Sequence, residues 1–291
     1  MPDSVDGPAV VDKPISLHEA ASRLGVHYMT VYRYVRTGRL PGTQVNGEWQ
    51  IDPADLAELA NAKKNQRRGR ARKSSGEWAD RFQAQLLAGD EAGAWKVAED
   101  VLTSGMKPTQ FYLEVLVPTL RHVGEAWSAG ELSIAQEHQA SAIARRVVGR
   151  LGPQFAKRGR KRGTVILGAP AGEQHDLPIA ILADLVREAG FRVSDLGANL
   201  PAESFVEFVR DAADVVAIGV SVTAAGNEEN VVALTAQLRS ATEAPIVLGG
   251  HGIPDEATAL ELGADYFADS GPAAVRRFDD LAAVRNQDKE A

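Results

Sequence analysis

Apolar residues recur with different periods in different parts of the chain. In the first part, residues 16–60, the pattern is mainly helical. It predicts two short amphipathic helices, a hairpin and a capped helix, at 16–26, 28–38, 39–51 and 52–60. Gly25 marks a tight turn between the two helices, and Asn46-Gly47 marks the turn of the hairpin. A helix pair followed by a hairpin is typical of a winged helix-turn-helix domain.

The middle of the chain has a helical period throughout, with Gly or Pro at the breaks. It predicts four helices that pack as a bundle, at 77–90, 91–105, 109–130 and 134–152. The connection 129–133 is short, so we expect the last two helices to be antiparallel neighbours. Trp127, at the end of one helix, is then expected near Glu137 and His138, at the start of the next.

Beyond residue 163, short apolar strands alternate with helices. The strands are predicted at 164–170, 192–197, 215–223, 245–250 and 264–269. Helical crossovers between them predict a doubly wound parallel sheet of the flavodoxin-like kind. Ligands of such sheets bind outside the carboxyl ends of the strands. That edge is where we expect His175, Ser221, Thr223, Gly249 and Gly250.

The expected fold is therefore multidomain: a winged helix-turn-helix, a four-helix bundle and an α/β flavodoxin-like (Rossmann-like) domain. The expected boundaries are 1–60 for the first, 61–76 for a basic linker, 77–155 for the bundle and 163–285 for the α/β domain. The chain has no Cys, which excludes disulfides and thiolate metal sites, so any metal needs nitrogen or oxygen ligands. No apolar stretch reaches the roughly 18 residues of a membrane span, and the N-terminus lacks a signal-peptide pattern. We expect a cytoplasmic protein without a membrane partner.

Charge is unevenly distributed along the chain. Residues 1–75 carry 12 Lys and Arg against 8 Asp and Glu, whereas the remaining residues carry 20 against 31. The basic end predicts a nucleic-acid partner. The run 63–73, KKNQRRGRARK, is either a solvated hinge or an arm that contacts phosphates, and 157–162, KRGRKR, is interpreted as a solvated linker with no assigned role. The side chains expected to contact double-stranded DNA are Thr30, Tyr32, Arg33, Arg36 and Arg39.

The loop after the first strand of the α/β domain, GEQHD (172–176), is not the glycine-rich loop that a nucleotide phosphate needs. With Ser221-Val222-Thr223 and Gly249-Gly250, it resembles the cobalamin-binding pattern Asp-x-His-x-x-Gly, Ser-x-Leu and Gly-Gly. The resemblance implies that His175 ligates cobalt as the lower axial ligand. It also implies that Glu173 holds the other nitrogen of the ring and so fixes its orientation.

The order of the domains resembles the CarH/LitR family of adenosylcobalamin-dependent photoreceptor regulators, with a helix-turn-helix of MerR type. That family carries in its bundle a Trp followed after nine residues by Glu-His, which Trp127 and Glu137-His138 match. The resemblance implies a repressor, not an enzyme, that binds operator DNA as a homotetramer in the dark. Light that breaks the cobalt–carbon bond of adenosylcobalamin would empty the volume beneath Trp127, dissociate the tetramer and release the DNA. The implied cofactor-binding residues are Trp127, Glu137, His138, Glu173, His175, Asp176, Ser221, Thr223, Gly249 and Gly250.

Three departures from the family's pattern bear on the interpretation. Pro178 stands where the motif has Gly, Thr223 stands where Leu is common, and Ser128 replaces a histidine that often follows the bundle Trp. In the family that histidine can ligate cobalt from above after photolysis, and Ser is a poor cobalt ligand. Three alternatives therefore stay open: a light-independent sensor of cobalamin or another tetrapyrrole, a corrinoid methyl-carrier protein, and a dimerising repressor that has lost its cofactor.

Overall fold

The computed structural model describes residues 13–45 and 47–290, and the side chains within those ranges other than 62–74 and 288–290. The chain forms two compact units, Met1–Gly76 and Glu77–Ala291, which are described separately. Asn46, at the predicted hairpin turn, lies outside the described residues, as do residues 1–12 of the first predicted domain. In the described part of the chain, no helix combines the length and apolar character needed to cross a membrane.

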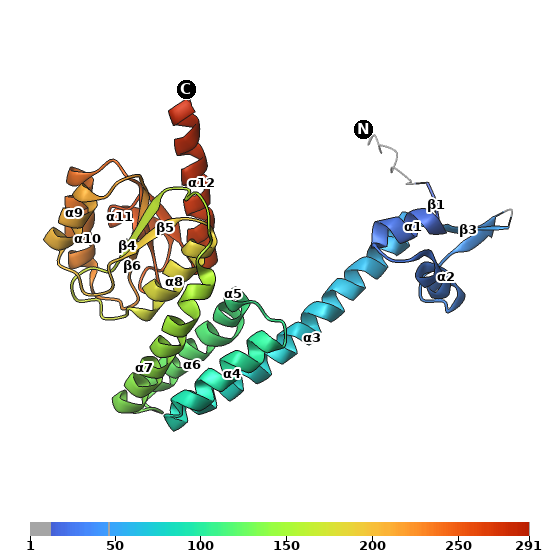
Figure 1. The fold of residues 1–291 in the computed structure, drawn as a ribbon, viewed down its shortest axis with the longest axis horizontal. Helices are drawn as coiled ribbons and strands as arrows, with labels where there is room; N and C mark the ends of the chain where they lie inside the picture. Colours follow the sequence, from blue (N-terminus) through green and yellow to red (C-terminus); the bar gives the residue numbers. More distant parts are fainter. Residues whose placement is uncertain (1–12, 46, 291) are drawn as a thin grey trace, which may run out of the picture. The chain divides into compact units, whose positions relative to one another are not determined.

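The first unit is a helix pair packed on a small antiparallel sheet with the strand order β1–β3–β2 (Figure 1). Its elements are β1 (Ile15–Ser16), α1 (Leu17–Leu24), α2 (Tyr28–Arg36), β2 (Thr43–Val45) and β3 (Glu48–Ile51). The Ser16 hydroxyl caps α1 by accepting from the N–H of Glu19 at 3.2 Å, and Gly25 ends it in the left-handed conformation, φ +62°. The predicted helices and hairpin are confirmed. Strand β1 is additional, because two residues are too few for an alternating pattern to mark.

Helix α3 (Pro53–Ala88) is longer than the apolar pattern predicts. Asp52 starts it by accepting from the N–H of Ala54 at 2.8 Å. The pattern predicts helices at 52–60 and 77–90 with a linker between them, whereas the backbone is helical throughout. The intervening segment is polar and so has no apolar period, but it is rich in Lys and Arg, which favour helix on propensity alone.

The bundle of the second unit contains the predicted four helical segments around one apolar core, with Phe82, Phe111 and Leu151 fully buried. The segments are the end of α3, then α4 (Glu91–Thr103), then the run α5 (Pro108–Phe111), η1 (Tyr112–Leu116) and α6 (Val117–Ser128), then α7 (Ile134–Leu151). The third segment differs from a regular helix because η1 is a turn of π-helix, in which each hydrogen bond spans one more residue.

The predicted parallel sheet is confirmed, with the order β5–β4–β6–β7–β8. The strands are β4 (Thr164–Gly168), β5 (Arg192–Asp195), β6 (Val215–Ser221), β7 (Ile246–Gly249) and β8 (Tyr266–Ala268). The helices are α8 (Leu177–Glu188), α9 (Ala202–Asp211), α10 (Glu228–Ala241), α11 (Glu256–Glu261) and α12 (Gly271–Glu290). They cover both faces of the sheet (Figure 1). Ile166 of β4 packs with α9, α10 and α11, whereas its neighbours Val165 and Leu167 pack with α8 and α12.

Helix α8 joins the α/β domain to the bundle. Its side chains Leu177, Ile181 and Leu185 belong to the apolar core of the bundle. The hydroxyl of Tyr112, in η1, donates to the buried carboxylate of Asp184 at 2.8 Å, and the guanidinium of Arg187 donates to the same carboxylate at 2.8 Å. Burial raises the pKa of Asp184, although these two hydrogen bonds oppose the shift. The two domains of the second unit are thus held together by a shared core that includes a polar contact.

Candidate functional site

Strand β4 positions the predicted cobalt ligand. All five of its residues are buried, it ends at Gly168, and α8 begins at Leu177. The loop between them, which carries His175, therefore lies at the carboxyl edge of the sheet, as predicted. Pro178 occupies the first turn of α8, where its missing N–H removes no hydrogen bond of the helix. The replacement of the motif's Gly by Pro178 is thus compatible with the local backbone.

Glu173 is the most constrained side chain of this loop, with only 1% of its surface exposed. One carboxylate oxygen, Oε1, accepts from the backbone N–H of His175 at 3.0 Å and contacts the ring Nδ1 of His175 at 2.5 Å. The other, Oε2, accepts from the N–H groups of Thr223 and Ala224, at 2.6 and 2.9 Å. Burial alone would raise the pKa of Glu173, but these hydrogen bonds outweigh it and lower the pKa to about 2. The carboxylate is therefore ionised at neutral pH.

The contact with Glu173 determines what the His175 ring can do. A proton on Nδ1 can be donated to the carboxylate, which leaves Nε2 of the neutral ring with its lone pair. Half of the side chain is exposed. The hydrogen bond to Glu173 raises the pKa of His175 against the opposing effect of burial, and the negative charges of Glu173, Glu137 and Asp176 raise it further. This orientation would allow Nε2 to act as a nitrogen ligand for a metal.

The ends of β6 and β7 complete this edge. Ser221 lies opposite Gly249 in the register of the two strands. A Cβ at Gly249 would lie 2.5 Å from the carbonyl oxygen of Ala268, and one at Gly250 would lie 2.2 Å from that of Val222. Packing within the protein therefore explains why both positions are Gly, because any side chain there would collide with the neighbouring backbone.

Thr223 is the residue at this edge that fits a ligand. Its hydroxyl oxygen is buried and has no hydrogen-bond partner within the described part of the protein. A buried hydroxyl without a partner is energetically unfavourable, so a polar group bound there would stabilise it. A hollow beside it is lined in part by Thr223, Glu228 and His251.

Helix α7 of the bundle lies beside the His175 loop. The guanidinium of Arg145 pairs with the carboxylate of Asp176 at 2.5 Å. Glu137 is close enough to affect the titration of His175, and its carboxylate accepts from the hydroxyl of Ser141 at 2.5 Å. Of the predicted bundle residues, the structure therefore brings Glu137 to the loop.

Trp127 and His138 are predicted at the same end of the bundle. Trp127 lies in the last turn of α6 with 46% of its surface exposed, and Ile134, at the start of α7, has 59% exposed. The ring of His138 is mostly exposed and lies 3.6 Å from the carboxylate of Glu137. The turn between α6 and α7 thus carries two exposed apolar side chains beside a carboxylate and an imidazole, a combination that suits a ligand with an apolar face and polar substituents.

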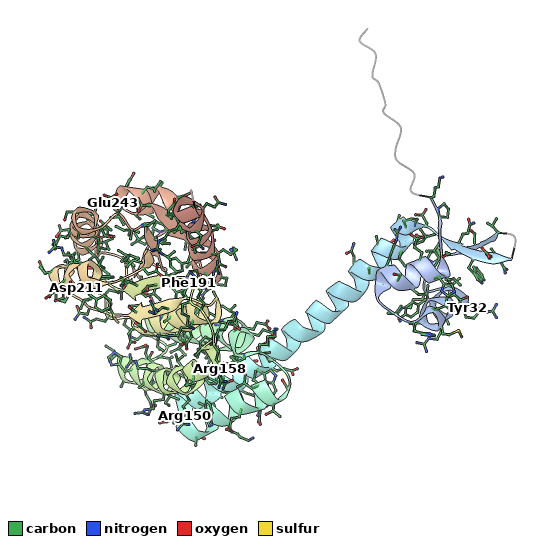
Figure 2. All side chains as sticks on the ribbon, turned by 45° about the horizontal axis from the view of Figure 1, so that its top comes forward. Tyr32, Arg150, Arg158, Phe191, Asp211 and Glu243 are labelled. Carbon is green, nitrogen blue, oxygen red and sulfur yellow. The ribbon has the colours of Figure 1, made fainter. Side chains whose placement is uncertain are left out.

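The helix-turn-helix presents a second candidate surface. Val31 and Val35 of α2 are buried, whereas Arg33, Arg36 and Arg39 are exposed. The other two predicted residues, Thr30 and Tyr32, are half-buried, and the ring of Tyr32 (Figure 2) stacks beside that of Tyr28. The guanidinium of Arg39 lies 5.0 Å from the centre of the Tyr34 ring. An exposed arginine face on the second helix is suited to major-groove contact.

The sequence does not predict every contact of the site. The N–H groups that hold Glu173 belong to a segment about fifty residues further on, and only the order of the strands brings them together. The sequence does contain a hint of Arg145, because Glu137, Ser141 and Arg145 are spaced four residues apart and so lie on one face of α7.

Three family models match the chain. A helix-turn-helix domain matches residues 15–64, and two different B12 binding domains match residues 78–151 and 163–278. The chain therefore carries a helix-turn-helix domain followed by a helical and an α/β cobalamin-binding domain. This is the fold that the sequence predicts.

Among curated proteins, the chain is 33% identical to the HTH-type transcriptional repressor CarH of Myxococcus xanthus, over 62% of this chain and 60% of the relative. It is 27% identical to trimethylamine corrinoid protein 2 of Methanosarcina mazei, over 65% of this chain and 88% of the relative. Among solved structures, the monomethylamine corrinoid protein of Methanosarcina barkeri has the same fold, with a TM-score of 0.59 and 20% identity over 69% of this chain and 96% of that one.

Proposed function

We propose that this chain, which has the domain architecture of the CarH-like transcriptional regulators, is a light-responsive repressor that uses adenosylcobalamin as its chromophore. One observation carries the proposal: the same chain bears an exposed arginine face on a helix-turn-helix and a histidine, His175, oriented by a buried carboxylate beside the bundle. The proposal includes a helix-turn-helix of MerR type and a location in the cytoplasm.

The residues of the carboxyl edge would hold the cofactor. Nε2 of His175 would ligate the cobalt, while Glu173 keeps the ring in the orientation described above. The Thr223 hydroxyl, which has no partner in the described part of the chain, would donate to a polar group of the cofactor. Asp176, Ser221, Gly249 and Gly250 would line the same edge.

The end of the bundle would cover the upper face. When bound, adenosylcobalamin supplies a cobalt–carbon bond that visible light can break. Trp127 would pack against the adenosyl group, and Glu137 and His138 would contact its polar edge. Without that group, Trp127 would have no apolar partner, which would favour a rearrangement of the bundle.

The change in assembly would release the DNA. A dark oligomer, expected to be a tetramer, holds several helix-turn-helix units together, and linked units bind one DNA molecule much more tightly than separate units do. Dissociation in the light would therefore be sufficient to free operator DNA. This mechanism needs no enzymatic turnover.

Size-exclusion chromatography with multi-angle light scattering tests the proposal. The full chain is loaded with adenosylcobalamin and run in the dark and after green light, with the visible spectrum recorded. A cobalamin-containing oligomer that becomes smaller on illumination is expected. Cobalamin binding without any change of size would support a light-independent sensor instead, and absence of binding would support a repressor that has lost its cofactor.

Ser128 is the observation that favours the light-independent sensor. It follows Trp127 at the exposed end of α6, and its hydroxyl is a poor replacement for an imidazole as a cobalt ligand. The Ser128→His variant separates the two functions. If the protein responds to light, this variant should retain cobalamin through gel filtration after illumination better than the unchanged protein.

A corrinoid methyl carrier is the second candidate function. It is favoured by the likeness of the bundle and α/β domain to the trimethylamine corrinoid protein. The helix-turn-helix at residues 15–64 has no role in that function. Binding of the cobalamin-loaded chain to DNA in a gel-shift assay would support the regulator, whereas methyl-group transfer to a corrinoid-dependent methyltransferase without DNA binding would support the carrier.

A further inference from the structure

The basic loop, residues 157–162, is the most concentrated positive charge of the second unit. Its sequence, KRGRKR, contains five of the 20 Lys and Arg of residues 77–291, which also contain 31 Asp and Glu. The loop connects the short helix η2 (Gly152–Phe155) to strand β4. Arg158 is marked in Figure 2. Lys157, Arg158 and Arg160 are exposed.

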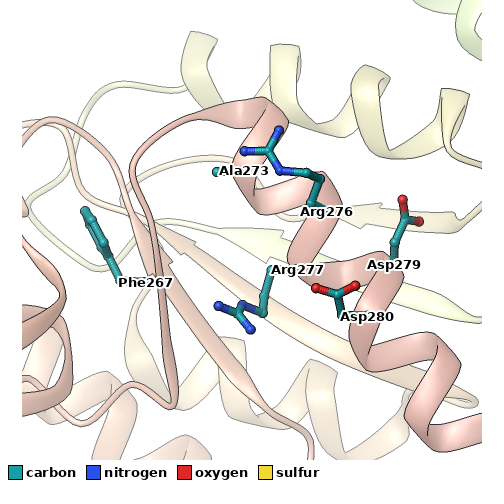
Figure 3. Close-up of a pocket in the computed structure, with 6 residues that line it drawn as sticks. All are labelled: Phe267, Ala273, Arg276, Arg277, Asp279 and Asp280. Atoms are coloured by element: carbon teal, nitrogen blue, oxygen red, sulfur yellow. The ribbon is translucent and has the colours of Figure 1, made fainter. Parts of the chain in front are cut away.

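Two of the five cations hold the loop in place. Arg162 pairs with Asp279 of α12, one of the residues around the hollow in Figure 3, and its guanidinium lies 4.7 Å from the centre of the Phe191 ring. The ammonium of Lys161 donates to the backbone oxygen of Lys157 at 2.5 Å. The other three cations, Lys157, Arg158 and Arg160, pair with no carboxylate in the described part of the chain. The loop thus has an ordered base and three free charges.

The position of the loop excludes the cofactor as its partner. It precedes β4, whereas His175 follows β4, so the two lie at opposite edges of the sheet. The five residues of β4 separate them by roughly 16 Å. Cobalamin carries a phosphate, but a corrin held by His175 lies at the carboxyl edge. The anion that the loop would bind must come from another molecule.

We propose that the basic loop contacts the phosphate backbone of DNA that the helix-turn-helix has bound, an inference that rests on the DNA-binding function proposed above. The rest of residues 77–291 is strongly acidic and is repelled by DNA, which carries about one negative charge per 1.7 Å of axis. The amino edge of the sheet is where this repulsion is locally reversed. The loop therefore orients the sensory part of the chain toward the duplex and adds sequence-independent affinity.

An acidic face of a second copy is the competing partner, but the observations favour DNA. Among the described residues, the carboxylates of the same unit leave three of the five loop cations unpaired, although they pair with several other arginines of that unit. A closely spaced row of cations without fixed carboxylate partners matches a continuous line of phosphates. The competing partner is kept as an outcome of the test.

The salt dependence of DNA binding measures these contacts directly. We would compare the full chain with the variant Lys157→Ala, Arg158→Ala, Arg160→Ala, which keeps Arg162 and Lys161 and so preserves the base of the loop. The probe is a fluorescein-labelled, mixed-sequence duplex, with fluorescence anisotropy recorded between about 50 and 200 mM KCl. The slope of log K against log salt is negative, and each lost phosphate contact reduces its magnitude by about 0.9, so the magnitude should fall by about 2.7 in the triple variant.

Three control variants separate local from general effects. Arg121→Ala, Arg210→Ala, Arg276→Ala removes three exposed charges elsewhere in the same unit and should leave the slope unchanged. Exchanging Lys and Arg at the three loop positions keeps the charge and should keep the slope. The double variant Arg33→Ala, Arg36→Ala tests the helix-turn-helix itself. It should reduce the magnitude of the slope of log K against log salt by about 1.8.

The outcomes distinguish this inference from the proposed function. If the helix-turn-helix variant loses slope but the loop variant loses less than about 0.9, the loop does not contact DNA and the proposed function stands. If neither variant loses slope, the proposed DNA binding itself fails. If the loop variant keeps its slope but changes the molar mass in light scattering, the loop binds a second copy and the inference is overturned.

Discussion

At the scale of single residues, Glu173 connects two loops that the sequence presents as unrelated. The sequence predicts its contact with His175, because the two are separated by a single residue in a recognisable pattern. Its contacts with the N–H groups of Thr223 and Ala224 are not predictable, since they depend on β4 and β6 being neighbours in the sheet. The Thr223 hydroxyl has no hydrogen-bond partner among the described residues, and this too is not predictable from the sequence because it depends on packing.

Replacing His175 with Ala should weaken the binding of adenosylcobalamin at least tenfold, because the ring supplies the proposed lower cobalt ligand. It should also remove the spectrum of histidine-ligated cobalamin. The measurement is a titration followed by visible absorbance in the dark. His122→Ala is the matched control, because His122 is an exposed histidine of α6 and should bind the cofactor normally. Equal affinity of both variants would remove His175 from the site.

The ionisation of Glu173 should make the stability of the cofactor-free protein depend on pH. The pKa of Glu173 is lowered from 4.5 to about 2 by its hydrogen bonds to His175, Ala224 and Thr223, which outweigh burial. The unfolded chain therefore takes up this proton at higher pH than the folded protein does. The stabilisation is present above about pH 4.5 and is lost as the pH falls toward 2, and it is on the order of 2 kcal/mol.

The variant Glu173→Gln isolates this effect, because its side chain does not titrate. Urea unfolding at pH 5 and pH 3, followed by circular dichroism, should show a smaller loss of unfolding free energy in the variant than in the unchanged protein. Glu243→Gln, at an exposed position, is the control and should behave like the unchanged protein. The same loss of stability in all three proteins would show that Glu173 is not held as an ion in the folded state.

At the scale of elements, the apolar period is a reliable guide to which segments are helices and strands, but it does not report the details of the backbone. The run 109–130 is predicted as one helix, and the π-helical turn η1 within it leaves the period almost unchanged. The segment 61–76 shows the opposite error, because it has no apolar period although its composition favours helix. The second difference arises where helix propensity, rather than burial, decides the structure.

The contact between η1 and α8 should contribute measurably to stability. Tyr112 and Asp184 are both buried, and their hydrogen bond links residues 72 positions apart. Tyr112→Phe keeps the ring but leaves a buried carboxylate with one partner fewer, so we expect the free energy of unfolding to fall by about 1–3 kcal/mol. Urea unfolding measures this change. Tyr266→Phe, on β8, is the control, and an equal loss there would show that the Tyr112 hydroxyl has no special role.

At the scale of the whole molecule, the order of the helix-turn-helix, helical and α/β domains could be predicted because each part has its own apolar period. The way the bundle and the α/β domain join could not, because that junction depends on side chains of α8 entering a core whose other members lie up to a hundred residues away. The uneven charge of the chain is visible in the sequence, but which molecule a charged segment can contact depends on where the segment lies in the fold. The structure places the basic loop and His175 at opposite edges of one sheet.

The proposed repressor should lose DNA affinity in the light through disassembly rather than through damage to its helix-turn-helix. Linking two binding units raises affinity by about 10²–10⁴ through effective concentration alone. A duplex with two half-sites, selected from a random library by the dark protein, should therefore bind the illuminated protein at least about 100-fold more weakly at fixed salt. A duplex with one half-site should bind both forms equally. An equal loss of affinity for both duplexes would mean that light acts on each DNA-binding unit separately. Light would then change DNA binding within one subunit, without dissociation of the oligomer.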